Sequence, residues 1–133
     1  MRRWISAGFK PNFSVLPKAL RLKNYNWNEE TFQEWPKIRE KWLANGVIEP
    51  IKKEQAMVIS PLYLKKEATK FRPIWDGRYV NQYITVPRIK YETLRDVRLM
   101  VSRGCKTIAF DLERGYHAIS IAPEWRKYFT FEV

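Results

Sequence analysis

The sequence predicts a mixed fold of the α+β class, because segments with helical periodicity and segments with strand periodicity occupy separate runs of the chain. Helical patterns cover residues 28–45 and 91–103. Alternating apolar patterns, typical of strands, cover residues 57–64, 71–75, 107–112 and 128–133. The chain has 133 residues, 45% of them hydrophobic and 15% aromatic, which is the size of one domain with enough apolar surface for a core.

Residues 1–27 form a predicted basic arm that precedes a domain of residues 28–133. Pro11 and Pro17 prevent a long helix, so we expect an extended arm that lies on a partner; the alternative is a solvated tail. A basic N-terminal segment without acidic residues is also typical of a mitochondrial transit peptide. The arm contains no acidic residue, and its candidate RNA-binding residues are Arg2, Arg3, Lys10, Lys18, Arg21 and Lys23. Its candidate anchors, by stacking or by filling pockets, are Trp4, Phe9, Phe13, Tyr25 and Trp27.

The helix predicted over residues 28–45 begins with Asn28 as a capping residue and ends before Gly46. Pro36 lies inside this run and should kink or split the helix. The apolar stripe expected to face the core consists of Phe32, Trp35, Ile38, Trp42 and Leu43. Such a stripe is more often a packing surface than a platform for stacking bases.

A β-hairpin is predicted from residues 57–64 and 71–75, with Glu67, Ala68 and Thr69 at its tip. The candidate phosphate-binding residues crowd this tip: Lys65, Lys66, Lys70 and Arg72. Several cations on an exposed hairpin are also a common solvated edge that resists strand pairing. Just after the hairpin, Asp76 and Arg78 are two residues apart, which favours a local ion pair or backbone cap over a catalytic role.

The last third of the chain predicts a helix over residues 91–103, ended by Gly104, and then two strands. The helix should turn its apolar side inward and its basic side outward; the inward residues are Leu94, Val97 and Val101, and the outward ones Arg95, Arg98 and Arg103. The strand over residues 107–112 should present Asp111 at its end. The strand over residues 128–133 should carry Phe129, Phe131 and Val133 on one face, as an apolar edge that a partner must cover.

Two blocks of this chain resemble the reverse transcriptases of retrotransposons. One block is Asp-Leu-Glu-Arg-Gly-Tyr-His at residues 111–117, followed by residues 126–131, and it resembles the family's first catalytic motif. The other block comprises residues 60–66, 70–73 and 76–81, and it is similar to the family's fingers hairpin. The resemblance implies a fingers hairpin with the first palm strands, ending before the second catalytic motif, an aromatic-X-Asp-Asp turn. The sequence holds no Asp-Asp pair.

The resemblance also implies roles for individual residues. Asp111 would bind both magnesium ions, and Tyr116 would lie under the sugar and exclude a 2′-hydroxyl. Lys66 and Arg72 would hold the triphosphate and pack on the base of the incoming nucleotide. The backbone amides of residues 113 and 114 would approach the triphosphate.

The charge of the chain favours a nucleic-acid partner over a membrane. Its net charge of +11 suits a polyanion, because neutralised phosphates release condensed counterions. No apolar stretch approaches the roughly 18 residues of a spanning helix. A single cysteine, Cys105, excludes an intramolecular disulfide, and with a single histidine, His117, it argues against a His/Cys zinc site.

We therefore expect a catalytically inactive, reverse-transcriptase-derived fragment that binds RNA and neighbouring proteins inside a ribonucleoprotein, such as an organellar ribosome. It would be intracellular, in the mitochondrial matrix, and would need no cofactor. The first alternative is the N-terminal part of an active RNA-directed DNA polymerase, in which Asp111 would bind Mg²⁺ together with carboxylates from elsewhere. The second is a protein–protein scaffold that buries its six tryptophans against partners.

Overall fold

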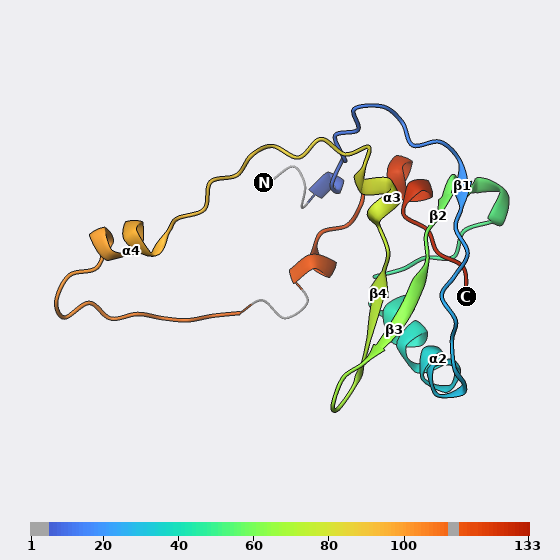
Figure 1. Cartoon of the computed structure of the whole chain (residues 1–133), viewed down its shortest axis with the longest axis horizontal. Coiled ribbons are helices and arrows are strands. Elements are labelled where there is room, and N and C mark those ends of the chain that lie inside the picture. The colour runs from blue at the N-terminus through green and yellow to red at the C-terminus, as the bar shows by residue number, and fades with distance from the viewer. Residues whose placement is uncertain (1–5, 112–114) are drawn as a thin grey trace.

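The computed structural model describes residues 6–111 and 115–133, and it shows a mixed α and β fold (Figure 1). The described helices are α2 (Glu29–Ala44), α3 (Arg78–Asn81) and α4 (Leu94–Met100). The strands are β1 (Leu20–Arg21), β2 (Val58–Ile59), β3 (Leu62–Lys66) and β4 (Phe71–Trp75), and short 3₁₀ segments cover Lys53–Gln55, Gly115–Ala118 and Pro123–Tyr128. The strands form two small sheets, one of β1 with β2 and the other of β3 with β4. The α+β class is thereby confirmed.

Helix α2 begins and ends where the sequence predicts. The Asn28 side chain accepts a hydrogen bond from the Thr31 amide at 2.9 Å, and the Thr31 hydroxyl donates to the Asn28 carbonyl at 2.7 Å. Gly46 follows the helix with a φ of 65°, a conformation that glycine adopts at little cost. Pro36 does not split the helix. Proline has no amide hydrogen, so one carbonyl of the preceding turn has no helical donor. Because Pro36 is exposed, solvent can reach that carbonyl.

The hairpin of β3 and β4 is the best-formed sheet of the described chain. Leu62 pairs with Trp75 and Lys66 with Phe71, and the Glu67 amide donates to the Lys70 carbonyl at 2.8 Å across the predicted tip. The strand expected over residues 57–64 is instead divided at Pro61 into β2 and β3, which belong to different sheets. Proline has no amide hydrogen for a ladder, so the chain changes sheets at this position.

The first hydrophobic cluster joins α2 to the inner face of the hairpin. Its buried members are Trp35, Leu62 and Leu64, and the residues packed around them are Trp27, Ile38, Trp42, Phe71, Trp75 and Phe131. Trp35 meets the rings of Trp27 and Phe131 nearly edge to face, with centroids 5.6 and 5.8 Å apart. The interpretation of the tryptophan stripe as core is confirmed for Trp35, whereas Phe32 and Leu43 of the predicted stripe are exposed.

Residues 8–27 of the N-terminal arm are extended, as expected, but they run over the chain's own body. Strand β1 pairs in parallel with β2, and the Leu22 amide donates to the Ile59 carbonyl at 2.9 Å. Phe13 enters the second hydrophobic cluster, which is built on Val58, Val80 and Tyr128. The interpretation of Phe13 as an anchor is thus confirmed, with the anchor surface in the same chain. Arg2, Arg3 and Trp4 lie outside the described residues.

The predicted C-terminal strand over residues 128–133 is wrong. A 3₁₀ segment ends at Tyr128, and Thr130 forms a single parallel bridge with Ile59. Phe129 is half-buried with its ring 5.7 Å from that of Trp75, and Phe131 packs against Trp35. The described residues thus show no open sheet edge near Phe129 and Phe131, because both rings pack in part against the chain itself, while Val133 is 51% exposed. The neighbouring proteins expected at this place stay a prediction.

Residues 86–111 leave the body as a long excursion that carries α4 (Figure 1). Helix α4 is shorter than the predicted 91–103 and starts at a capping box between Thr93 and Asp96. The residues expected to face inward are exposed: Leu94, Val97 and Val101. The strand predicted over 107–112 is absent from residues 107–111, where Ile108 is 90% and Phe110 is 85% exposed. No strand of the described chain lies beside this segment to complete a ladder.

Candidate nucleic-acid interface on the β3–β4 hairpin

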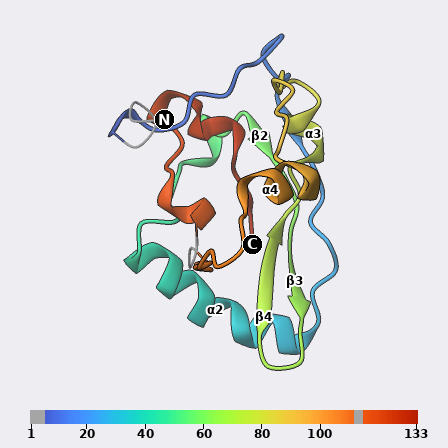
Figure 2. The ribbon, with the colours of Figure 1, turned by 90° about the vertical axis from the view of Figure 1, so that its left-hand side faces the viewer.

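The hairpin has an inner face that packs on α2 and an outer face that carries cations. Successive side chains of a strand alternate between faces, so the register places Tyr63, Lys65, Arg72 and Ile74 together on the outer face. Lys65 lies directly opposite Arg72, and Tyr63 directly opposite Ile74. Figure 2 shows the same hairpin turned by 90°, with its tip at one end of the body. The sequence could have revealed this grouping from the strand alternation alone.

The four cations predicted at the tip differ in their partners. Lys66 pairs with Glu30 of α2 at 2.6 Å, and Arg72 pairs with Glu67 at 3.0 Å. Both members of each ion pair are at least partly exposed. Lys65 and Lys70 are exposed, and neither forms an ion pair within the part of the chain that the structure describes. Exposed ion pairs are weak and exchange readily with other anions. All four residues are thus accessible to a phosphate.

A hydrogen-bonded network lies at the base of the hairpin. The Tyr25 hydroxyl donates to Oδ2 of Asp76 at 2.6 Å and accepts from Nη2 of Arg78 at 2.9 Å. Nη2 of Arg78 also donates to Oδ2 of Asp76 at 2.6 Å, which confirms the predicted ion pair. The hydrogen bonds from Arg78 and then from Tyr25 hold the pKa of Asp76 well below its usual range. The hydrogen bond to Asp76 raises the pKa of Tyr25.

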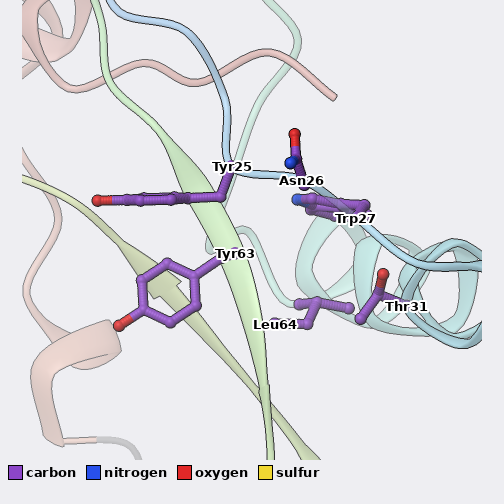
Figure 3. Close-up of a pocket in the computed structure, with 6 residues that line it drawn as sticks. All are labelled: Tyr25, Asn26, Trp27, Thr31, Tyr63 and Leu64. Atoms are coloured by element: carbon purple, nitrogen blue, oxygen red, sulfur yellow. The ribbon is translucent and has the colours of Figure 1, made fainter.

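A pocket of about 260 Å³ lies between the arm and β3, lined by Tyr25, Asn26, Trp27, Thr31, Tyr63 and Leu64 (Figure 3). The rings of Tyr25 and Tyr63 meet edge to face, with centroids 5.1 Å apart and planes inclined by 72°. The indole of Trp27 is fixed by a hydrogen bond to the Leu62 carbonyl at 3.1 Å. Sequence reasoning missed Tyr63, and it named Tyr25 only as an anchor. The two tyrosines are far apart in the chain, so no local signal could pair them.

The predicted catalytic residues do not lie beside the hairpin in the structure. Asp111 is exposed on the excursion, in a segment that lies well away from β3 and β4 in Figure 1. Tyr116 is 96% exposed. Across residues 6–111 and 115–133, no group of three histidine, cysteine or acidic side chains is placed to hold a metal ion. Residues 113 and 114, whose amides the resemblance assigns to the triphosphate, lie outside the described residues.

The cations of the N-terminal arm are dispersed along the body. Lys10 pairs with Glu124 at 3.3 Å, and Nη2 of Arg21 donates to the Lys53 carbonyl at 3.1 Å. Lys18 and Lys23 are exposed. The arm therefore widens the positive surface without forming a compact site of its own.

Searches against protein-family models and against curated proteins find no match for this chain. The resemblance to reverse transcriptases therefore rests on the sequence motifs. None of the helices in the described ranges is long and apolar enough to cross a membrane.

Proposed function

We propose that this chain is an RNA-binding module of reverse-transcriptase type, which contacts the phosphate backbone through the outer face and tip of the β3–β4 hairpin. The observation that carries the proposal is the placement of Lys65 opposite Arg72 on that face, with Lys70 at the tip. Neutralising phosphates with these residues would release counterions, which is the main source of affinity in sequence-independent binding. The net charge of +11 acts in the same direction.

The hairpin suits this role because its scaffold is fixed while its cations are accessible. Leu62 and Leu64 anchor β3 against Trp35 of α2. A rigid hairpin fixes the backbone positions from which the cationic side chains extend, so little backbone entropy is lost on binding. By resemblance, these are the positions through which the family's fingers meet the incoming nucleotide. In this chain we assign them to RNA phosphates.

We further propose that the chain serves as a binding and structural subunit of a ribonucleoprotein, with the mitochondrial matrix as its location, and that it does not polymerise nucleotides by itself. Of the carboxylates that the family uses, the motif comparison identifies Asp111 alone. Two-metal nucleotidyl transfer needs several carboxylates converging on both ions. A longer polymerase that supplies the others is the rival proposal, and its cofactor would be Mg²⁺.

A scaffold function is the second candidate, favoured by the excursion. Its exposed apolar side chains include Ile89, Leu94, Leu99, Met100, Ile108 and Phe110. Many exposed apolar side chains in one segment are typical of a protein-binding segment. Neighbouring proteins would thus meet the excursion, in place of the predicted edge near Phe129 and Phe131.

The proposal is tested by fluorescence anisotropy with a labelled single-stranded RNA. The combined variant Lys65→Ala, Lys70→Ala and Arg72→Ala should bind roughly 100-fold more weakly, if each contact contributes about 1 kcal/mol. The matched control, with the same loss of charge, is Lys41→Ala, Lys52→Ala and Lys127→Ala, at exposed positions outside the hairpin. Equal weakening by both variants would refute a hairpin site.

The polymerase rival is tested by primer extension with magnesium or manganese. We expect no incorporation by the 133-residue chain. Template-dependent incorporation that disappears in Asp111→Ala would contradict the proposal.

A further inference from the structure

We propose that the pocket between the arm and β3 is a nucleobase site, in which one base of a bound single-stranded RNA packs against the rings of Tyr25, Tyr63 and Trp27. This inference rests on the proposed RNA binding and names the group that is recognised beside the phosphates. It assigns a function to Tyr25 and Tyr63, which belong to neither hydrophobic cluster. Tyr25 in particular remains 42% exposed although its hydroxyl is firmly bonded.

The pocket has the size and chemistry of a site for a single ring system. Its volume of about 260 Å³ is below the roughly 300–1,000 Å³ of sites for drug-sized ligands. Leu64 and Thr31 are buried and supply a mainly apolar floor, while Tyr25, Tyr63 and Trp27 supply aromatic walls. Single-stranded bases are recognised in proteins mainly by stacking on such rings.

The walls are held in place before any ligand binds. Asp76 and Arg78 fix the Tyr25 hydroxyl from two sides, at 2.6 and 2.9 Å. The Trp27 indole is held by its bond to the Leu62 carbonyl and by the ring of Trp35. Aromatic side chains that are already ordered lose little entropy when they stack on a ligand, so their contacts count almost fully towards affinity.

One polar group at the rim is available to a base. The Asn26 carboxamide lines the pocket, and its side chain has no hydrogen-bond partner among residues 6–111 and 115–133. Figure 3 shows its side chain directed away from Leu64 and Thr31. A carboxamide offers both a donor and an acceptor, which suits the hydrogen-bonding edge of a base.

Tyr63 connects the pocket with the outer face of the hairpin, which carries the proposed phosphate contacts. Tyr63 and Lys65 are two residues apart on β3, which places them on the same face and roughly 7 Å apart along the strand. A base that enters beside Tyr63 therefore brings its own sugar-phosphate chain over Lys65 and Arg72. This charge complementarity favours a nucleic acid over a peptide with an aromatic side chain as the occupant.

The experiment compares a short single-stranded oligoadenylate with an abasic oligomer of the same length and charge. The native chain should bind the oligoadenylate more tightly than the abasic oligomer. Tyr25→Ala should weaken oligoadenylate binding by about 5- to 100-fold, the range for one lost stacking contact, and should leave abasic binding unchanged. Tyr25→Phe should retain most of the affinity because the ring remains. The control Tyr91→Ala removes an exposed tyrosine of the excursion and should change neither.

The outcomes separate this inference from the proposed function. If native binding is salt-dependent but equal for the two oligomers, and Tyr25→Ala changes nothing, the nucleobase site is refuted and phosphate binding stands. If neither oligomer binds, the proposed function is refuted and the nucleobase site with it. If Tyr25→Ala weakens both oligomers equally while its thermal unfolding matches that of the native chain, the residue acts on the phosphate surface and the inference is again refuted.

Discussion

Replacing Trp35 with alanine should loosen α2 from the hairpin, because this side chain is the buried centre of the first hydrophobic cluster. Its ring centroid lies 5.6, 6.2 and 5.8 Å from those of Trp27, Trp42 and Phe131. Leu62 and Leu64 are the other buried members of this cluster. Removing a large buried aromatic side chain costs about 3–5 kcal/mol. Domains of this size are stable by about 5–15 kcal/mol, so the variant should lose a large part of its folding free energy.

Urea unfolding followed by circular dichroism measures this loss. Phe32→Ala is the matched control, since it truncates an aromatic residue of the same helix that is 58% exposed. The control should change the free energy of unfolding by less than about 1 kcal/mol. Equal losses in the two variants, or a Trp35→Ala variant within about 1 kcal/mol of the native chain, would refute the proposed packing of α2.

Two further predictions concern the arm and the Asp76 network. Gly8→Ala should lower the Tm, because Gly8 has a φ of 80° and an added Cβ would lie 2.7 Å from the backbone nitrogen of Ala122. The control is Gly46→Ala: Gly46 has a φ of 65°, but an added Cβ would meet no atom within 4 Å. This control should cost only the backbone strain of about 1–2 kcal/mol. The Asp76 carboxylate, with its lowered pKa, stabilises the fold above the usual carboxyl pKa and loses this contribution as pH falls through its folded pKa. Asp76→Asn should therefore lower the Tm near neutral pH and flatten the acid part of the Tm profile; parallel profiles would contradict this.

Local sequence signals predicted the elements whose ends are set by local contacts, such as a helix cap or a tight turn. Asn28 and Gly46 defined α2, and the turn at residues 67–69 defined the hairpin. The strands expected over 107–112 and 128–133 failed for a different reason, since a strand needs a neighbour that alternation in one segment cannot reveal. The same limit applies to the site. Lys65 and Arg72 were found from their place on the hairpin, whereas the contact of Tyr25 with Tyr63 depends on the path of the arm.

The exposed apolar surface also lies in a different place from the predicted one. Phe129 and Phe131 looked exposed in sequence because no later strand was assigned to cover them, yet Trp35, Trp75 and Phe13 pack against their rings. The excursion instead exposes its apolar residues, although helical periodicity predicted that Leu94, Val97 and Val101 face inward. Periodicity shows which residues share a face, but it does not show that another element lies against that face.

The salt dependence of RNA binding tests the central claim most directly. For a single strand, log K should fall linearly with log salt, with a slope of about −0.7 for each phosphate neutralised. Removing Lys65, Lys70 and Arg72 together should flatten the native slope by about 2, the value for three lost phosphate contacts. A slope that is unchanged in this triple variant, or a native slope near zero, would contradict an RNA interface on the β3–β4 hairpin.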